Sequence, residues 1–581
     1  MDQKWNYDLT SLLRLYKPHD VLVTCKGSDN GFVEYQNAIA SRFSQQPVVW
    51  KRHGKPFQYP LTFPIKFCAF DESLCFGPHM TQSDLPNIAY LHLYVIDSAS
   101  VDEYRTSVRH NVSEWFAKVS SKSDVQWLII VDSTRAKEKK NRPSLLEKLR
   151  HDFSKHTSKL VEVSESVEHG SFVGLVQAVQ SALFAHLDIL TDTWETFLSN
   201  SRGKYTDMNW SLSSYCYSTM EYARLFWSLG ALDHSLTLYN ELDQYLFDIV
   251  EEMAITRVDR EPRWIVSLRS ENLPFLSLYS SFEQSKIDLK KNHSLIAIRH
   301  FLVAQQILLS LCIYNARHRS RGAAPSLRVD FAALILKYTK HVLDIALVQS
   351  RTALMNVATS RLACWSLVIC SETLHITGLL AEPSTVEGAA ASVCAIQLQR
   401  FSSMLDLSNL SECDTSEARD LLDWLSVNDS SESPEFLREM LQSSSNFAAQ
   451  LLKAYDTATT TLVQWGRNRQ AMHVGWRMAE WMRKNSRNAG NALTLETRFI
   501  SSLLSSGCRS EVVVDVMKFV IPHLDAKDDY DKLLEYRLFI ALHATNLDDR
   551  RRFAADFISQ LEERRNRKFG LFKNLSNLKF F

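Results

Sequence analysis

The chain has 581 residues, of which 45% are apolar and 23% are charged. This length exceeds what one hydrophobic core usually organises, so we expect two or more folded units. Because the 66 basic residues equal the 66 acidic ones, the chain lacks the strongly basic footprint of a nucleic-acid-binding domain, and no nucleic-acid partner is expected.

The cysteines and the N-terminal residues indicate a cytoplasmic protein. Ten cysteines are scattered over the sequence, too sparsely for a disulfide scaffold. The first ten residues have neither the basic region nor the apolar region of a signal peptide. We therefore expect a reducing, cytoplasmic compartment.

The first third of the chain alternates strand signals with helix signals. Seven of the 14 prolines precede residue 90, which argues against long helices there. Runs rich in β-branched and aromatic residues predict strands at 21–24, 47–50, 88–96, 125–131 and 160–163. Helical patterns lie between them at 33–43, 100–119 and 145–153. This alternation is typical of β-α-β units, so residues 15–185 are predicted to form an α/β domain with a largely parallel sheet.

Two loops of this domain are candidates for binding a ligand. Gly27 and Gly31 follow the first strand, but their spacing matches neither the dinucleotide-binding motif nor the P-loop, and a tight strand-to-helix turn is the preferred interpretation. Residues 135–142 form a basic loop, for which simple solvation is preferred over a phosphate or membrane contact.

From Phe172 onward helical periodicity dominates, so the protein is predicted to be predominantly α overall. Residues 186–567 are predicted to form an irregular α-solenoid. Residues 220–242 resemble a tetratricopeptide hairpin, with Gly230 in its turn and Ser235 where the two helices approach. Apart from a helix at 172–197, further helices are expected at 293–317, 329–348, 352–380, 388–407, 434–465, 468–485, 493–506, 509–524, 528–544 and 548–567.

Three segments interrupt or end this pattern. Loops are expected at 317–326, which is basic and rich in helix breakers, and near 411–433, which is rich in Ser, Asp and Glu. Residues 568–581 are predicted to form an amphipathic tail.

Residues 295–314 are the best candidate for a membrane span. They are largely apolar but carry Arg299, His300, Gln305 and Gln306, which are costly at the centre of a bilayer. A buried solenoid helix is therefore the preferred interpretation.

No residue is assigned to a catalytic, cofactor-binding or metal site. Neither the G-x-S-x-G nor the H-E-x-x-H motif occurs. Cys68, Cys75 and His79 lie in one stretch, but they are one ligand short of a zinc site and too widely spaced. Cys364 and Cys370 lie in an apolar helical stretch and are expected to be small buried hydrophobes. We expect no cofactor and no enzymatic activity.

Several stretches, taken in order, resemble a known family. They are residues 23–27, 47–52, 91–94, 124–131, 146–153 and 238–243. They are similar to the N-terminal half of the family of subunit 10 of the trafficking protein particle (TRAPP) complex, the large subunit specific to TRAPP II. None of the stretches is a catalytic signature, so the resemblance rests on their number and order. Family members continue into C-terminal β-sandwich domains, which are not expected within these 581 residues; a natural short form and an incomplete sequence both remain open.

The resemblance implies a non-catalytic scaffold that supports Rab guanine-nucleotide exchange and vesicle tethering in Golgi traffic. It implies as partners the TRAPP core subunits, the other TRAPP II large subunit and, through the assembled complex, a Rab-type GTPase. The implied location is cytoplasmic and peripheral to Golgi membranes. Two alternatives remain open: a nucleotide-binding α/β enzyme with a helical repeat domain, and a tetratricopeptide-like adaptor unrelated to trafficking.

Overall fold

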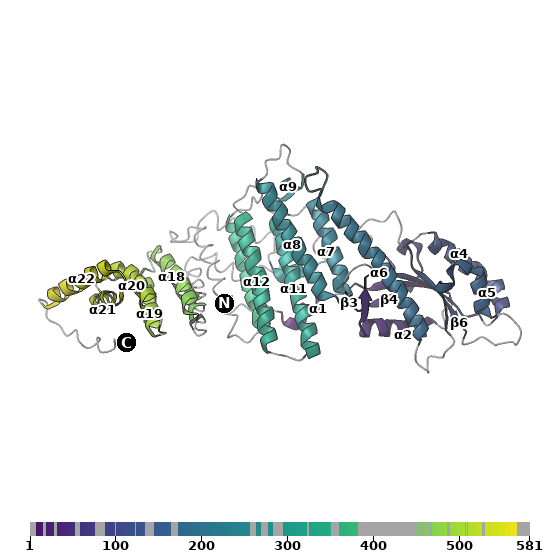
Figure 1. Cartoon of the computed structure of the whole chain (residues 1–581), viewed down its shortest axis with the longest axis horizontal. Coiled ribbons are helices and arrows are strands. Elements are labelled where there is room, and N and C mark those ends of the chain that lie inside the picture. Colours follow the sequence, from purple (N-terminus) through teal and green to yellow (C-terminus); the bar gives the residue numbers. More distant parts are fainter. Residues whose placement is uncertain are drawn as a thin grey trace.

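The computed structural model of the chain is elongated, with an α/β unit at one end and helices along the rest of its length (Figure 1). It describes residues 7–15, 19–27, 32–52, 58–75, 88–98, 100–121, 124–133, 144–163, 172–255, 263–268, 277–282, 294–321, 325–349, 359–380, part of 449–463, 467–484, 489–505, 507, 509–525 and 529–565.

The α/β unit contains a five-stranded sheet in which every neighbouring pair of strands is parallel. Its strands lie in the order β4-β1-β5-β6-β7, with a separate antiparallel hairpin formed by β2 and β3. The strands are β1 (Val21–Gly27), β2 (Val48–Lys51), β3 (Gln58–Leu61), β4 (Ile65–Ala69), β5 (Leu91–Ile96), β6 (Trp127–Asp132) and β7 (Leu160–Val163). The predicted fold class is confirmed.

Helices cover both faces of the sheet. They are α2 (Phe32–Gln45), α3 (Val101–Glu103), α4 (Arg109–Ser120), α5 (Leu145–Asp152) and α6 (Val173–Arg202). Because successive residues of a strand point to opposite faces, β5 serves two cores. Leu91, Leu93 and Val95 pack with α2 and α6, whereas Tyr94 and Ile96 pack with α4 and α5. The continuous apolar runs of β5 and β6 therefore mark central strands of a three-layer unit.

The structure contains two strands, β3 and β4, that the sequence analysis did not predict. β3 contains Pro60, which a two-stranded antiparallel hairpin tolerates at its edge. β4 is an edge strand whose Lys66 faces solvent, so it lacks a continuous apolar run. After β5, the N-cap is Ser100, whose hydroxyl accepts a hydrogen bond from the Glu103 amide.

The remaining helices pack as successive neighbours. They are α7 (Leu212–Ser228), α8 (Leu232–Ile255), α9 (Arg263–Leu268), α10 (Leu278–Phe282), α11 (Leu295–Arg321), α12 (Pro325–Gln349), α13 (Thr359–Leu380), α18 (Asn468–Lys484), α19 (Ala489–Ser505), α20 (Ser510–Asp525), α21 (Tyr530–His543) and α22 (Leu547–Arg565). Figure 1 shows α6, α7, α8, α11 and α12 side by side. In the described part of the chain after residue 200 there is no strand.

The tetratricopeptide-like hairpin has the turn and the close helix approach that its sequence predicts. Gly230 lies between α7 and α8 with a φ of 80°, which glycine adopts without steric cost. The fully buried Ser235 hydroxyl donates a 2.7 Å hydrogen bond to the Ala223 carbonyl of the facing helix. A larger side chain at position 235 would separate the two helices.

Two expectations about helix α11 have different outcomes. Its apolar segment is entirely buried inside the protein, which confirms a core helix and not an exposed span. α6 is the second helix long and apolar enough to cross a membrane, and it packs on the sheet. The loop predicted at 317–326 is wrong over most of its length, because α11 continues to Arg321 and α12 begins at Pro325, a favourable first-turn residue.

Several predicted features lie outside the described residues. These are the basic loop 135–142, the helix at 388–407, the loop near 411–433 and the tail 568–581. The domain boundaries stay predictions. α6 runs without a break across residue 185, where the sequence places the end of the α/β domain.

Candidate functional site

The carboxyl edge of the sheet is where open α/β sheets bind ligands, at the point where the strand order reverses. Here that point lies between β1 and β5. The helical segment after β5 carries Asp102 and Glu103 in its first turn. α5, after β6, is closed by a capping box between Ser144 and Glu147. Both helix starts thus carry their own negative charges, which disfavours an anionic phosphate there.

Gly27 ends β1 with a φ of 116°. A Cβ atom at this position would lie 2.0 Å from the Val95 carbonyl oxygen of β5, so no other residue fits without a backbone shift. The glycine is required by the close approach of two strands, which supports the tight-turn interpretation. Gly31 lies outside the described residues.

The cysteines of the considered zinc cluster belong to different environments. Cys75 is fully buried in the core between the sheet, α4 and α5, whereas Cys68 is half-buried on β4. Burial raises the pKa of the Cys68 thiol, which disfavours the thiolate that a metal needs. His79 lies outside the described residues. Among those that are described, no three His, Cys, Asp or Glu side chains are grouped to hold a metal ion.

Helix α13 contains Cys364 and Cys370, which the sequence predicts to be small buried hydrophobic side chains. Cys370 is buried in the helical core, as expected. The side chain of Cys364 lies outside the described set.

The most strongly built polar contact joins the β2–β3 hairpin to the helices. Arg52, just after β2, forms ion pairs with Asp192 and Glu195 of α6. The Tyr222 hydroxyl of α7 donates a 3.0 Å hydrogen bond to the same Glu195 carboxylate. The hydrogen bond to Glu195 raises the pKa of Arg52 despite its partial burial. One guanidinium thus ties the hairpin to α6, and through Glu195 to α7.

Apolar and backbone contacts extend this junction. Trp50 of β2 is almost fully buried, and its indole N–H donates a 3.1 Å hydrogen bond to Asp188 of α6. The Thr62 amide donates a 2.8 Å hydrogen bond to the Leu229 carbonyl at the α7–α8 turn. A Cβ atom on the adjacent Gly230 would lie 2.9 Å from the Thr62 hydroxyl. The α/β unit and the first helical hairpin therefore form one packed body.

The junction was missed at the sequence level. Asp188, Asp192 and Glu195 fall on one face of α6 at spacings of four and three residues, which a helix normally turns to solvent. Only the pairing with Arg52 changes that interpretation. A usable signal was that Trp50 and Arg52 lie two residues apart in a proline-flanked segment of the α/β unit.

The N-terminal segment returns to the solenoid across more than 360 residues. Tyr7 stacks on Tyr279 with ring centroids 4.6 Å apart, and its hydroxyl donates a 2.8 Å hydrogen bond to Glu372 of α13. The helix α1 (Leu9–Arg14) that follows buries Leu12 in the helical core. The chain end thus packs against helices that are distant in sequence.

Glu372 is the centre of that contact. It is fully buried and accepts hydrogen bonds from the Ser277 hydroxyl and from the Leu278 and Tyr279 amides at the start of α10, at 3.0, 2.6 and 2.8 Å. Burial raises the pKa of Glu372 to about 7, although these four donors oppose the rise. The carboxylate substitutes for a side-chain cap at this helix end.

The comparisons with known proteins agree with the resemblance seen in the sequence. Residues 16–204 match the family model described as trafficking protein particle complex subunit 10-like, N-terminal. The chain is 22% identical over 496 residues to the mouse (Mus musculus) protein "Trafficking protein particle complex subunit 10", covering 80% of this chain and 38% of the relative. The human (Homo sapiens) protein of that name is 21% identical over 369 residues, covering 61% of this chain and 28% of the relative.

A third relative has the same name. The Drosophila melanogaster protein is 21% identical over 309 residues, which are 51% of this chain and 25% of the relative. The chain thus spans a quarter to two-fifths of the length of these curated relatives. It is similar to subunit 10 of the TRAPP complex over both the α/β unit and much of the helical part, and the predicted resemblance is confirmed.

Proposed function

We propose that this chain is a non-catalytic scaffold subunit of TRAPP II, which supports Rab guanine-nucleotide exchange and vesicle tethering in Golgi traffic. The observation that carries the proposal is the colinear similarity to TRAPP subunit 10, which covers 80% of the chain in the mouse relative. We further propose a cytoplasmic protein that associates peripherally with Golgi membranes.

The physical features of the molecule support a scaffold. A junction of ion pairs and buried aromatic residues fixes the α/β unit to the first helical hairpin. An extended array of helices offers several partners separate surfaces, as solenoids do. The proposed partners are the TRAPP core subunits, the other TRAPP II large subunit and a Rab-type GTPase that contacts the assembled complex.

The proposal predicts how the chain behaves in a nucleotide-exchange assay. The isolated chain should not accelerate release of a fluorescent GDP analogue from any Rab protein, because the proposed role is to position the core and not to open a nucleotide site. When it is added to purified core subunits, the relative rates on different Rab proteins should change.

Three arms complete that assay: core alone, chain alone, and core with chain. Acceleration by the chain alone would refute the non-catalytic role. Identical rates with core alone and with core plus chain, for every Rab tested, would refute the proposed influence on GTPase choice.

A melting-temperature measurement with nucleotides tests the enzyme alternative. A nucleotide-binding α/β enzyme would be stabilised by its ligand in proportion to ligand occupancy. A rise of several degrees in the melting temperature of the chain with ATP, GTP or NAD, absent with inorganic phosphate, would favour that alternative over the scaffold.

A further inference from the structure

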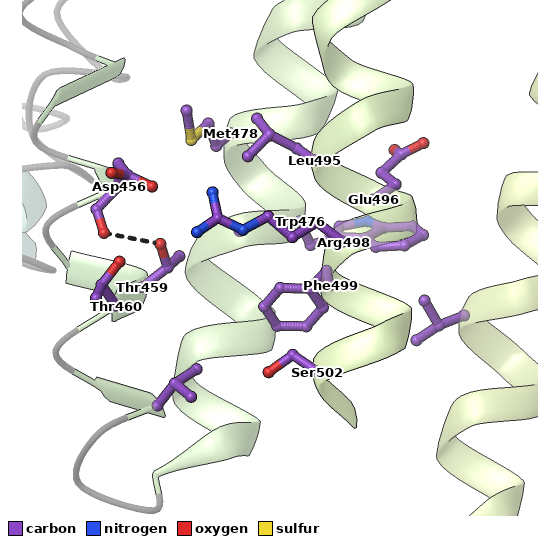
Figure 2. A pocket seen from close by; sticks show the side chains of 13 residues that line it. Asp456, Thr459, Thr460, Trp476, Met478, Leu495, Glu496, Arg498, Phe499 and Ser502 are labelled. Carbon is purple, nitrogen blue, oxygen red and sulfur yellow. Dashed lines mark hydrogen bonds between the residues drawn. The ribbon is translucent and has the colours of Figure 1, made fainter. Parts of the chain in front are cut away.

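A cavity of about 190 Å³ lies in the C-terminal helices. It is formed between the helical segment within 449–463 and helices α18, α19 and α20 (Figure 2). Its apolar lining includes Val463, Trp476, Met478, Leu495, Phe499 and Val516. Polar groups gather at one side, where Asp456, Thr459, Thr460 and Arg498 line the cavity.

Gly475 lines the cavity, and its lack of a side chain lets neighbouring residues approach α18 closely. Gly475 lies inside α18, and a Cβ atom there would come within 3.2 Å of the Phe499 ring of α19 and 3.5 Å of the Thr459 methyl group. Glycine within a helix costs roughly 1 kcal/mol relative to alanine. Helix α18 therefore carries a residue of low helix propensity at a position where a Cβ atom would press against the Phe499 ring that lines the cavity.

The size of the cavity limits what it can hold. Drug-sized ligands and cofactors usually occupy about 300–1,000 Å³, whereas a buried apolar cavity of about 150 Å³ accepts a molecule the size of benzene. A volume of about 190 Å³ thus fits one aromatic or large aliphatic side chain, and it is too small for a nucleotide. Such pockets for a single side chain are typical of the energetic centres of protein interfaces.

The mouth of the cavity carries a cation with no partner among the described residues. Arg498 is exposed, and within the described part of the chain no hydrogen bond or ion pair holds its guanidinium. Figure 2 shows that its side chain reaches from α19 toward the turn that carries Asp456 and Thr459. Glu496, a carboxylate of α19 that also lines the cavity, forms an ion pair with Arg483.

Asp456 is the remaining charge at the mouth. It is exposed and forms no ion pair with a described residue. Since Arg498 is not neutralised by it, a carboxylate from outside the chain can form a charge-assisted hydrogen bond with the guanidinium.

The apolar surface continues beyond the cavity. Trp476 contacts Phe519 of α20, with ring centroids 4.0 Å apart. Phe519 is 41% exposed, and its ring also contacts His523 and the Arg483 guanidinium, which lies 4.4 Å from the ring centroid. Residues flanking an anchor side chain would find an aromatic surface here.

We propose that this cavity is a docking pocket for a partner protein, which inserts one aromatic or large aliphatic side chain from a segment whose neighbouring carboxylate pairs with Arg498. The occupant follows from the volume, the apolar walls and a guanidinium that no described residue pairs. The proposal adds a specific interaction surface and holds whether or not the chain assembles into TRAPP II.

The minimal probe is 3-phenylpropionate, which joins one aromatic ring to one carboxylate. Its amide, 3-phenylpropanamide, has the same shape without the charge. Ligand-observed NMR titration of the full chain should detect binding of the acid with a millimolar dissociation constant. The amide should bind at least about tenfold more weakly than the acid, because charge-assisted hydrogen bonds commonly contribute a factor of ten or more to affinity.

Three variants separate the pocket from the surrounding surface. Arg498→Glu should lower the affinity for the acid about tenfold or more. Thr460→Trp, at the exposed rim, should prevent binding of both probes. Arg551→Glu on α22 makes the same charge change away from the cavity and should leave affinity unchanged. Melting temperatures close to wild type would show that each variant is folded.

Binding of the acid that is equal in the Arg498→Glu and Arg551→Glu variants would overturn the proposal. So would undetectable binding of the acid at 10 mM, or binding of both probes that survives Thr460→Trp.

Discussion

Replacing Asp243 by alanine is expected to lower the free energy of unfolding by about 3–5 kcal/mol, because it leaves a fully buried arginine without its counter-charge. Arg299 of α11 has no exposed surface. It forms an ion pair with Asp243 of α8 and donates a 3.2 Å hydrogen bond to the Asp243 carbonyl. The His341 ring of α12 lies 3.4 Å from the same carboxylate. Three helices thus converge on one aspartate.

The pKa shifts of Arg299 and Asp243 also indicate that each charge stabilises the other. Burial lowers the pKa of Arg299, and the Asp243 charge opposes that change. Burial raises the pKa of Asp243, but His341 and Arg299 outweigh it and hold this pKa below its ordinary value. A carboxyl group whose pKa is lowered by folding stabilises the folded state at pH values above its ordinary pKa. That stabilisation is lost as the pH falls through the pKa of the folded state.

Urea denaturation followed by helical circular dichroism measures the effect. Asp248→Ala, on the exposed side of the same helix, is the matched control and should change stability by no more than about 0.5 kcal/mol. The double variant Asp243→Leu with Arg299→Met should recover much of the loss, because it removes both charges. If Asp243→Ala behaves like the control, the buried pair does not hold these helices together.

Replacing Glu372 by alanine should release the N-terminal segment from the solenoid. Four hydrogen bonds end on this carboxylate. Without it, the buried Leu278 amide at the start of α10 loses its acceptor, at a cost of about 1–3 kcal/mol, whereas the Tyr279 amide keeps a 3.1 Å hydrogen bond to the Ser277 hydroxyl. Hydrogen exchange at residues 9–14 should therefore accelerate, since the segment that leads into α1 would lose the hydrogen bond from Tyr7 to Glu372.

Tyr7→Phe is a milder change than Glu372→Ala, because it removes one hydrogen bond and keeps the ring stack with Tyr279. Its effect should be close to about 1 kcal/mol. Unchanged hydrogen exchange at residues 9–14 in the Glu372→Ala variant would contradict the role assigned to this carboxylate.

The same variant tests the pH dependence of the fold. Burial raises the pKa of Glu372 from 4.5 to about 7 in the folded state. The folded state therefore binds the proton more tightly, and the contribution of Glu372 to stability falls as the pH rises from about 4.5 to 7. The difference in stability between wild type and Glu372→Ala should shrink over that interval and become constant above it.

Periodicity alone predicted the central strands and the long helices described, but not the short helices α1, α9 and α10. Strands β5 and β6 are buried on both faces, so their apolar runs are continuous. Edge strand β4 escaped prediction because its outward residues are polar. Polar residues in an apolar helix were a signal that the sequence did offer: Arg299 and Glu372 interrupt apolar runs, and both are fully buried.

Contacts between distant segments could not be predicted from local patterns. Arg52 meets Glu195 only because the β2–β3 hairpin lies over α6, and Tyr7 meets Glu372 across 365 residues. The cavity at Gly475 likewise depends on the packing of α18 against α19. One glycine in a helical pattern does not indicate whether a cavity or a close contact lies beside it.

The most direct test of the account is mass spectrometry of the proteins that co-purify with the tagged chain from its native cells at stoichiometric abundance. The scaffold proposal predicts the TRAPP core subunits together with the other TRAPP II large subunit. Recovery of the chain in a stable assembly that contains no TRAPP core subunit would contradict it.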